Sequence, residues 1–260
     1  MYSNIIWEKK DGVGYITLNR PNVLNAISLE LLREIEQVLQ ESATDDGVQA
    51  VVITGTGRAF SAGADMKVFS EVIKAPLRVK HWLDTWHGIM NYIETQPKPT
   101  IARVNGLALA GGLELMLVCD LAVADEEARL GDQHAVFGVI AGGGGSQRLP
   151  RLLGARRAKE LLYTGSWISG KEAERIGLVN RAVPASQLDA AVKELTDRLK
   201  ERSSVATSTV KSLVNFGLQA DLLTGLEMEK WATMTHNQTD DAQEGFRAFM
   251  EKRKPKFTGR

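Results

Sequence analysis

Hydrophobic positions in the first two-thirds of the chain alternate between short β-branched runs and segments with helical spacing. Residues 13–19, after the turn at residues 11–12, have a strand composition, and residues 50–54 form a continuous apolar run typical of a buried strand. Between them, apolar residues recur on one helix face, and Ser28 stands where an N-cap belongs. That face consists of Leu29, Leu32, Ile35, Val38 and Leu39. The pattern predicts a strand, a helix and a second strand.

The same alternation continues to about Ser169. Residues 100–104 predict a third strand after the proline-containing break at 97–99, and residues 118–124 predict a fourth strand after a short helix. Strands that alternate with helices indicate an α/β fold.

Beyond Ser169 the pattern becomes helical. Ser169 and Glu172 form a capping box that opens a helix. Helical spacing then recurs, without a convincing strand, over residues 188–199, 205–218, 222–234 and 242–250. We therefore expect a helical C-terminal part packed on an α/β core.

Charge and cysteine content exclude several classes of protein. The 260 residues include 32 Lys and Arg against 32 Asp and Glu, so no overall field exists to hold a polyanion, and we expect no nucleic-acid partner. The single cysteine, Cys119, excludes an internal disulfide, which fits a reducing compartment such as the cytoplasm. The first ten residues also lack the apolar run of a secretory signal.

The longest apolar stretch, residues 107–124, is predicted to be a buried core segment. It contains Glu114 and Asp120, and a charge at the centre of a bilayer costs about 2.5 kcal/mol or more. We therefore expect no membrane partner.

Two glycine-containing segments, residues 58–67 and 104–114, follow predicted strands and precede helical patterns. Small residues leave backbone N–H groups uncovered at such positions, and the helix dipole adds partial positive charge. Two such turns facing each other would form an oxyanion hole. For either segment alone, close-packing glycines at an ordinary strand end are the alternative.

Ordered matches to one known family extend over essentially the whole chain. They are Leu18-Asn19-Arg20-Pro21 with Asn25-Ala26, residues 59–65, Asn105-Gly106 with Gly111-Gly112-Leu113-Glu114, residues 142–149, Thr164-Gly165, residues 173–179, Glu244-Gly245, Phe249 and residues 252–255. In these residues the chain resembles the enoyl-CoA hydratase/isomerase family, the crotonase superfamily.

The resemblance implies an α/β, crotonase-like superhelix of β-β-α turns followed by a C-terminal helical trimerisation region. Residues 1–195 would form the acyl-CoA-binding core, and residues 196–260 the oligomerisation region. It further implies a homotrimer or homohexamer, with no cofactor because coenzyme A is part of the substrate.

The resemblance also assigns binding residues. The backbone amides of Ala64 and Gly111 would hold the thioester oxygen of an acyl-CoA. Residues expected to line the CoA cleft are Ala26, Ala62, Ala64, Asp65, Met66 and Lys67, with Ala26 near the adenine. The basic residues 252–256 either form a solvated end or approach the CoA phosphates.

Glu114 is the main candidate for acid/base chemistry. It lies three residues after Gly111, so a helix starting there places both on nearly the same face. Its neighbours Leu113 and Leu115 are apolar, and burial without a partner would raise the pKa of its carboxyl toward neutrality. The alternative is a structural carboxylate paired with an arginine or a backbone N–H.

The chain departs from the family pattern at His134. A family hydratase carries a second glutamate twenty residues after the first, between two glycines seven apart, and here His134 stands between Gly131 and Gly138. Imidazole is also competent near neutrality, so hydration of an α,β-unsaturated acyl-CoA by Glu114 and His134 is the leading hypothesis.

Other interpretations of His134 remain open. A branch of the superfamily that hydrolyses C–C bonds in cyclic β-diketones carries histidine here, so the resemblance also implies a C–C bond or thioester hydrolase as an alternative. The family's isomerases use a carboxylate at this position, and its absence argues against an isomerase. A histidine that only hydrogen-bonds in the cleft wall, and a scaffold that binds acyl-CoA or RNA without catalysis, are further alternatives. Asp132 lies two residues away, where it could orient His134 through a ring N–H, although a spacing of two residues does not favour that contact.

Other motifs are incomplete. The nucleophile elbow around Ser61 lacks its first glycine, and residues 142–146 lack the Lys-Ser/Thr ending of a phosphate loop. His81 and His87 are six residues apart, which does not place them on one helix face, so we expect no metal site.

Overall fold

Six strands form the larger sheet of the computed structural model, which describes residues 2–260. Its order is β1 (Ile5–Lys10), β2 (Val13–Leu18), β3 (Ala50–Gly55), β5 (Thr100–Val104), β7 (Leu121–Asp125) and β10 (Arg181–Val183). The β1 strand pairs antiparallel with β2, and every later pair is parallel. Parallel neighbours need crossover connections, and these connections carry the second sheet and the helices.

The smaller sheet contains β4 (Ala59–Ser61), β6 (Leu107–Leu109), β8 (Arg129–Gly131) and the antiparallel β9 (Ile168–Ser169). Three times the chain passes from the larger sheet to the smaller and then into a helix. These turns are β3-β4-α2 (Met66–Val72), β5-β6-α4 (Gly111–Leu117) and β7-β8-α5 (Gly145–Leu153). The expected α/β superhelix of β-β-α turns is confirmed, and its repeat brings the starts of α2, α4 and α5 to one region.

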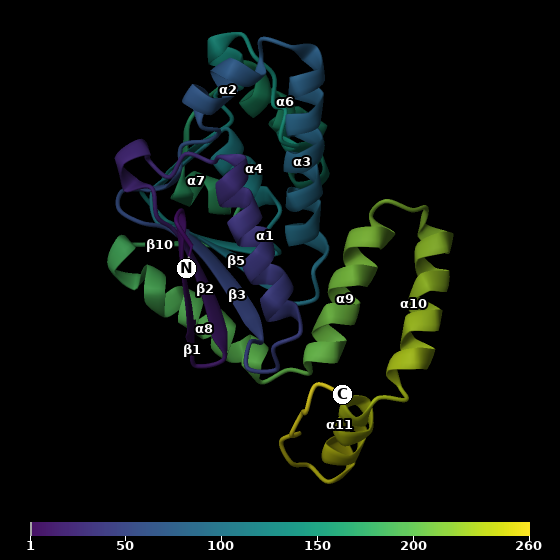
Figure 1. The fold of residues 1–260 in the computed structure, drawn as a ribbon. Helices are drawn as coiled ribbons and strands as arrows, with labels where there is room; N and C mark the ends of the chain where they lie inside the picture. The colour runs from purple at the N-terminus through teal and green to yellow at the C-terminus, as the bar shows by residue number, and fades with distance from the viewer. Residues whose placement is uncertain (1) are drawn as a thin grey trace.

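Helices cover both faces of the larger sheet (Figure 1). On one face lie α1 (Leu29–Ala43), α3 (Pro76–Thr95) and α4, and on the other lies α8 (Leu188–Lys200). Alternate residues of β3 point to opposite faces of the sheet. Ile53 lies in the main core, and Val52 packs with Leu188 and Val192 of α8. The other short helices are η1 (Pro21–Val23), η2 (His134–Phe137), α6 (Ala155–Thr164), α7 (Gly170–Arg175) and η3 (Ala185–Gln187).

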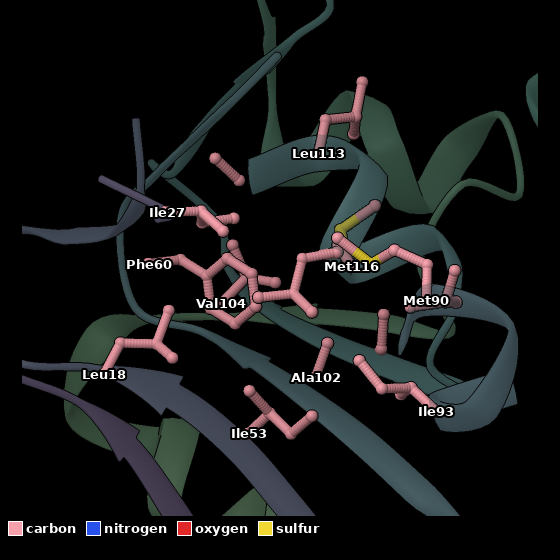
Figure 2. Close-up of a cluster of buried hydrophobic side chains, with 14 of the residues drawn as sticks. Leu18, Ile27, Ile53, Phe60, Met90, Ile93, Ala102, Val104, Leu113 and Met116 are labelled. Atoms are coloured by element: carbon pink, nitrogen blue, oxygen red, sulfur yellow. The ribbon is translucent and has the colours of Figure 1, made fainter. Parts of the chain in front are cut away.

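The main core lies between the sheet and α3 and α4. Figure 2 shows Ile53 and Ala102 on the strands, with Met116 from α4 above them and Met90 and Ile93 from α3 to their right. All five side chains are buried. This packing anchors α4 on the sheet. The N-terminal end of the helix, at Gly111, is therefore held in a fixed position relative to the sheet.

Local sequence signals account for most element boundaries. Ser28 caps α1, its Oγ accepting from the backbone N–H of Leu31 at 3.2 Å, and Ser169 caps α7 in the same way from Glu172 at 3.1 Å. The predicted strand at 100–104 is confirmed as β5.

Two strand predictions need correction. The expectation of no strand after Ser169 is wrong, because β10 (Arg181–Val183) adds in parallel to β7. Three residues are too few to show a period, and backbone pairing with a preformed neighbour decides their conformation. The strand predicted at 118–124 begins at Leu121, since α4 extends to Leu117 and Val118 is still in the right-handed helical region.

The C-terminal helices stand beside the core rather than over it. Figure 1 shows α9 (Ser204–Gly217) and α10 (Leu222–His236) as a pair next to α3, with α11 (Asp240–Met250) and the C-terminus below them. An ion pair of 2.8 Å between the buried Lys211 and the partly exposed carboxylate of Asp120 ties α9 to the core. Residue 195 lies within α8, and α9 starts after the capping residue Ser203. None of the helices in residues 2–260 combines the length and apolar character of a membrane span.

Candidate active site

The two glycine-containing turns lie side by side and present one free backbone N–H group each. A Cβ placed on Gly111 would lie 3.1 Å from the backbone nitrogen of Ala64, and one on Gly63 would lie 3.1 Å from that of Gly111. Neither amide donates to an acceptor within residues 2–260. Two uncovered donors in one place can stabilise a developing oxyanion.

Unusual backbone conformations create these turns. Gly63 has φ +105°, and Ala110, directly before α4, has φ +47° and ψ −118°, which a residue with a Cβ rarely adopts. Ala110 is held there because its N–H donates to Gly131 and its carbonyl accepts from Glu114, both at 3.0 Å. Strain of this kind persists only where the surrounding structure enforces it, and here it sets the direction of the Gly111 N–H.

Ser61 supports the first turn and is not placed as a nucleophile. Its side chain is fully buried, and its Oγ donates to the carbonyl of Asn25 at 2.9 Å and accepts from Gly63 at 3.2 Å. Gly112 packs directly against the Ser61 backbone, where a Cβ would collide with the carbonyl. The hydroxyl thus ties the first turn to the Asn25 segment, while the Ser61 backbone contacts the second turn at Gly112.

Glu114 is buried at the end of the site, with 2% of its surface exposed. Its Oε1 accepts from the backbone N–H groups of Gly143 and Gly145, both at 2.8 Å, and its Oε2 accepts from no donor in residues 2–260. Burial raises the pKa of the Glu114 carboxyl above its usual range, although the two N–H donors and His134 act in the opposite direction. One oxygen is therefore fixed and the other is free for proton transfer.

Asp132 and His134 are in contact, so the expectation that a spacing of two residues disfavours this contact is wrong. Asp132 Oδ1 lies 3.0 Å from Nδ1 of His134. Burial lowers the pKa of the His134 imidazole, but the hydrogen bond and charge of Asp132, together with the charge of Glu114, raise it above its usual range overall. Glu114 and His134, predicted as a pair, act on each other electrostatically.

The residues expected to line the CoA cleft form one strip. The Ala62 N–H donates to Leu24 at 2.9 Å, and Ile27 pairs with Ala64 across a parallel bridge. Arg20 joins both segments through the Ala26 carbonyl at 2.6 Å and an ion pair with Asp65 at 2.8 Å. Met66 and Lys67 follow at the exposed start of α2, which Asp65 caps.

Aromatic side chains close the other side of the site. Trp82 stacks on Trp86 with ring centroids 4.6 Å apart, and Phe69 lies 5.0 Å from Trp82. A Cβ on Gly111 would come within 3.1 Å of the Trp86 ring, and one on Gly143 would collide with both Trp86 Nε1 and Glu114 Oε2. The indole therefore lies next to both the Gly111 turn and the free carboxylate oxygen of Glu114.

Known proteins are similar to this chain in sequence and architecture. A family model described as enoyl-CoA hydratase/isomerase matches residues 8–260. The chain belongs to this family. A crotonyl-CoA hydratase of Syntrophomonas wolfei is 38% identical over 257 residues, covering 98% of both chains, and a short-chain-enoyl-CoA hydratase of Clostridium acetobutylicum is 38% identical over 253 residues, covering 97% of this chain and 96% of its own.

Solved structures of the family match the whole fold. An enoyl-CoA hydratase of Bacillus anthracis superposes with a TM-score of 0.93 at 40% identity, over 99% of this chain and 100% of its own. An enoyl-CoA hydratase structure from Geobacillus kaustophilus gives 0.94 at 39% identity, over 100% of this chain and 99% of its own. The crotonase-like fold expected from the motifs is thus confirmed.

Sequence reasoning missed the parts of the site that come from loops. The Gly143 and Gly145 amides hold Glu114, yet the glycine run was considered only as a family match and as an incomplete phosphate loop. His87 contacts the Gly142 carbonyl through Nε2 at 2.6 Å. Within residues 2–260 no three His, Cys, Asp or Glu side chains are grouped to hold a metal ion.

Proposed function

We propose that this protein is an enoyl-CoA hydratase that adds water across the double bond of an α,β-unsaturated acyl-CoA. The observation that carries the proposal is the pair of free amides at Ala64 and Gly111 beside the free Oε2 of buried Glu114. The names of its relatives, crotonyl-CoA hydratase and short-chain-enoyl-CoA hydratase, support hydration of a short acyl group. They do not favour the hydrolase or isomerase alternatives.

The amides of Ala64 and Gly111 would bind the thioester oxygen. Addition of water at Cβ moves charge onto that oxygen, and donors already in place stabilise the enolate more than the substrate. One such donor is worth about 2.7–4 kcal/mol in comparable sites. The positive end of the α4 dipole acts in the same direction.

Glu114 and His134 would carry the protons. Glu114 Oε2 takes a proton from the attacking water, while Oε1 stays fixed by its two N–H donors. His134 replaces the second glutamate of the family pattern as the partner acid/base group. Because burial raises the pKa of Glu114, the carboxylate that accepts the proton is lost at a higher pH than for an exposed glutamate.

Coenzyme A would lie along the strip formed by Ala26, Ala62, Ala64, Asp65, Met66 and Lys67. Small side chains at the first three positions let the ligand approach the backbone. The net charge of zero supplies no general attraction for the phosphates, so Lys67 and the basic residues 252–256 are the proposed cations. No cofactor is needed, because CoA enters with the substrate, and the single cysteine supports a cytoplasmic location.

A homotrimer, or a hexamer of two trimers, would be built by residues 196–260. Large apolar side chains are exposed on α9–α11, and such a patch indicates a protein contact. They are Val210, Val214, Phe216, Leu218, Leu222, Leu223, Leu226, Trp231, Met234, Phe246, Phe249 and Met250.

Light scattering after gel filtration is expected to give three or six times the chain mass of 28.5 kDa. Phe249→Glu, at a position 81% exposed in the single chain, should lower that mass, because a charge would be buried in the contact. Ile6→Lys, on the exposed side of β1, is the control that leaves the mass unchanged. A wild-type protein that runs as a monomer would contradict the assembly.

Crotonyl-CoA tests the activity itself. The absorbance of the conjugated thioester is expected to fall, and the product is expected to gain the mass of one water while keeping its CoA. A panel of enoyl-CoA substrates of increasing length then defines the acyl group. Release of free CoA, or cleavage of β-diketones with no turnover of any enoyl-CoA, would instead establish a hydrolase.

A further inference from the structure

The segment that carries His134 folds back on itself. Gln133 has φ +61°, in the left-handed region, and the His134 N–H donates to the Asp132 carbonyl at 2.8 Å and contacts Oδ1 at 3.3 Å. This tight turn brings the imidazole to the carboxylate only two residues earlier in the chain. The Nδ1–Oδ1 contact of 3.0 Å is therefore built by the backbone.

Asp132 is more buried than a surface turn requires. Its side chain is 1% exposed, and its Oδ2 is a buried oxygen without a hydrogen-bond partner in residues 2–260. A Cβ on Gly145 would lie 3.1 Å from Glu114 Oε1 and 3.3 Å from Asp132 Oδ2, so the two carboxylates flank this glycine. A second buried carboxylate beside Glu114 is costly unless a cation compensates it.

We propose that Asp132 is the positioning residue of the site, holding His134 with its proton on Nδ1 so that Nε2 is the working nitrogen opposite Glu114. The inference rests on the proposed hydration for its chemistry, but the hydrogen bond that carries it exists without substrate. With Nδ1 engaged, Nε2 is the ring nitrogen that has no partner in residues 2–260, and the side chain is still 18% exposed. Asp132 thereby selects both the tautomer and the direction of the ring.

The arrangement assigns separate proton roles. Water forms a C–O bond at Cβ and gives its proton to the Glu114 carboxylate, while the π electrons move into the enolate at Ala64 and Gly111. The enolate Cα then takes the proton of Nε2–H, and the imidazolium becomes neutral. Product release leaves Glu114 protonated and His134 neutral, and one proton must pass from Glu114 to His134 before the next turnover.

The charges around the ring support an imidazolium donor. Asp132 on its own segment and Glu114 on α4 are the charged groups that shift its pKa. The helix α6 also packs against η2, and its charged residues Arg156, Arg157, Lys159 and Glu160 do not contribute to that shift. Together they raise the pKa of His134 despite its burial. The imidazolium form of His134 then persists to higher pH, and activity is expected to fall as the pH rises through this raised pKa.

Asp132→Asn is the test, because asparagine keeps the shape and one acceptor oxygen but removes the charge. We expect kcat for crotonyl-CoA to fall on the order of 10²-fold, with KM changed less than about twofold. The alkaline limb of kcat/KM is expected to move to lower pH, since the group that raises the pKa of His134 is gone. In a His134→Ala background the same substitution should have little further effect, because the two act as a unit.

A ground-state measurement separates this inference from the proposed function. Imidazole ¹⁵N spectra of the wild-type protein are expected to show the proton of neutral His134 on Nδ1, and those of Asp132→Asn to show a mixture of tautomers. The exposed Asp46→Asn is the matched control for kcat, pH profile and spectra. The inference would be overturned if Asp132→Asn kept the wild-type tautomer of His134 and the wild-type alkaline limb of kcat/KM. It would also be overturned if Asp132→Asn lowered kcat equally in the wild-type and His134→Ala backgrounds. Absence of hydration in the wild type would instead contradict the function.

Discussion

Glu114→Gln is expected to lower kcat for crotonyl-CoA hydration by about 10²–10⁴-fold, the usual contribution of a positioned acid/base group. Glutamine is isosteric, and its amide oxygen can still accept from Gly143 and Gly145, so the glycine loop should keep its place. The amide nitrogen, however, cannot take a proton from water. Initial rates with crotonyl-CoA measure the loss of kcat, and a binding titration with CoA checks that the glycine loop keeps its place.

The control for Glu114→Gln is Glu8→Gln on the exposed side of β1. It makes the same chemical change away from the site and should leave kcat and the unfolding temperature unaltered. Burying a neutral amide in place of a carboxylate costs less, so Glu114→Gln should unfold at the wild-type temperature or above it. Full activity in a folded Glu114→Gln protein would remove Glu114 from the mechanism.

Gly111→Ala is expected to reduce kcat/KM by about 10²–10³-fold, as the loss of one oxyanion donor does elsewhere. Its φ is not in the left-handed region, so alanine fits the helix start, but the new Cβ would lie 3.1 Å from both the Ala64 nitrogen and the Trp86 ring. The methyl group thus occupies space between the two donors that the thioester oxygen needs. Steady-state kinetics with crotonyl-CoA measure the effect.

Gly88→Ala is the matched control for Gly111→Ala. Gly88 lies inside α3, and a Cβ there meets no atom within 4 Å. Its kcat/KM should stay at the wild-type value, and its free energy of unfolding should rise by about 0.5–1 kcal/mol, because alanine loses less backbone entropy in a helix. Wild-type kcat/KM in Gly111→Ala would show that the Gly111 amide does not bind the oxyanion.

Much of the fold could be predicted because its signals are local. Apolar spacing with Ser28 as cap specified α1, a continuous apolar run specified β3, and a short strand-like run after the proline-containing break at 97–99 specified β5. The strands of the smaller sheet and β10 have two or three residues each, which is too short for a period to appear. Their conformation depends on a neighbouring strand that is distant in sequence.

The candidate site, like the fold, could be predicted only in part. Ala64, Gly111 and Glu114 were found from small residues at strand-to-helix passages and from an acid within an apolar run, together with the family resemblance. The Asp132–His134 contact was disfavoured on spacing, because the left-handed conformation of the residue between them cannot be predicted from residue types alone. Trp86 lies beside Gly111 only because α3 packs across the start of α4.

The sequence by itself determined the α/β order, the family and the identity of the groups available for chemistry, since these follow from residue type, period and ordered motifs. Only the tertiary structure decided which oxygen of Glu114 is free, which nitrogen of His134 is engaged, and that the amides of Ala64 and Gly111 face one space. Those features depend on backbone groups from β-β-α turns far apart along the chain. Backbone N–H groups are the same in every residue, so their direction is set by packing and not by composition.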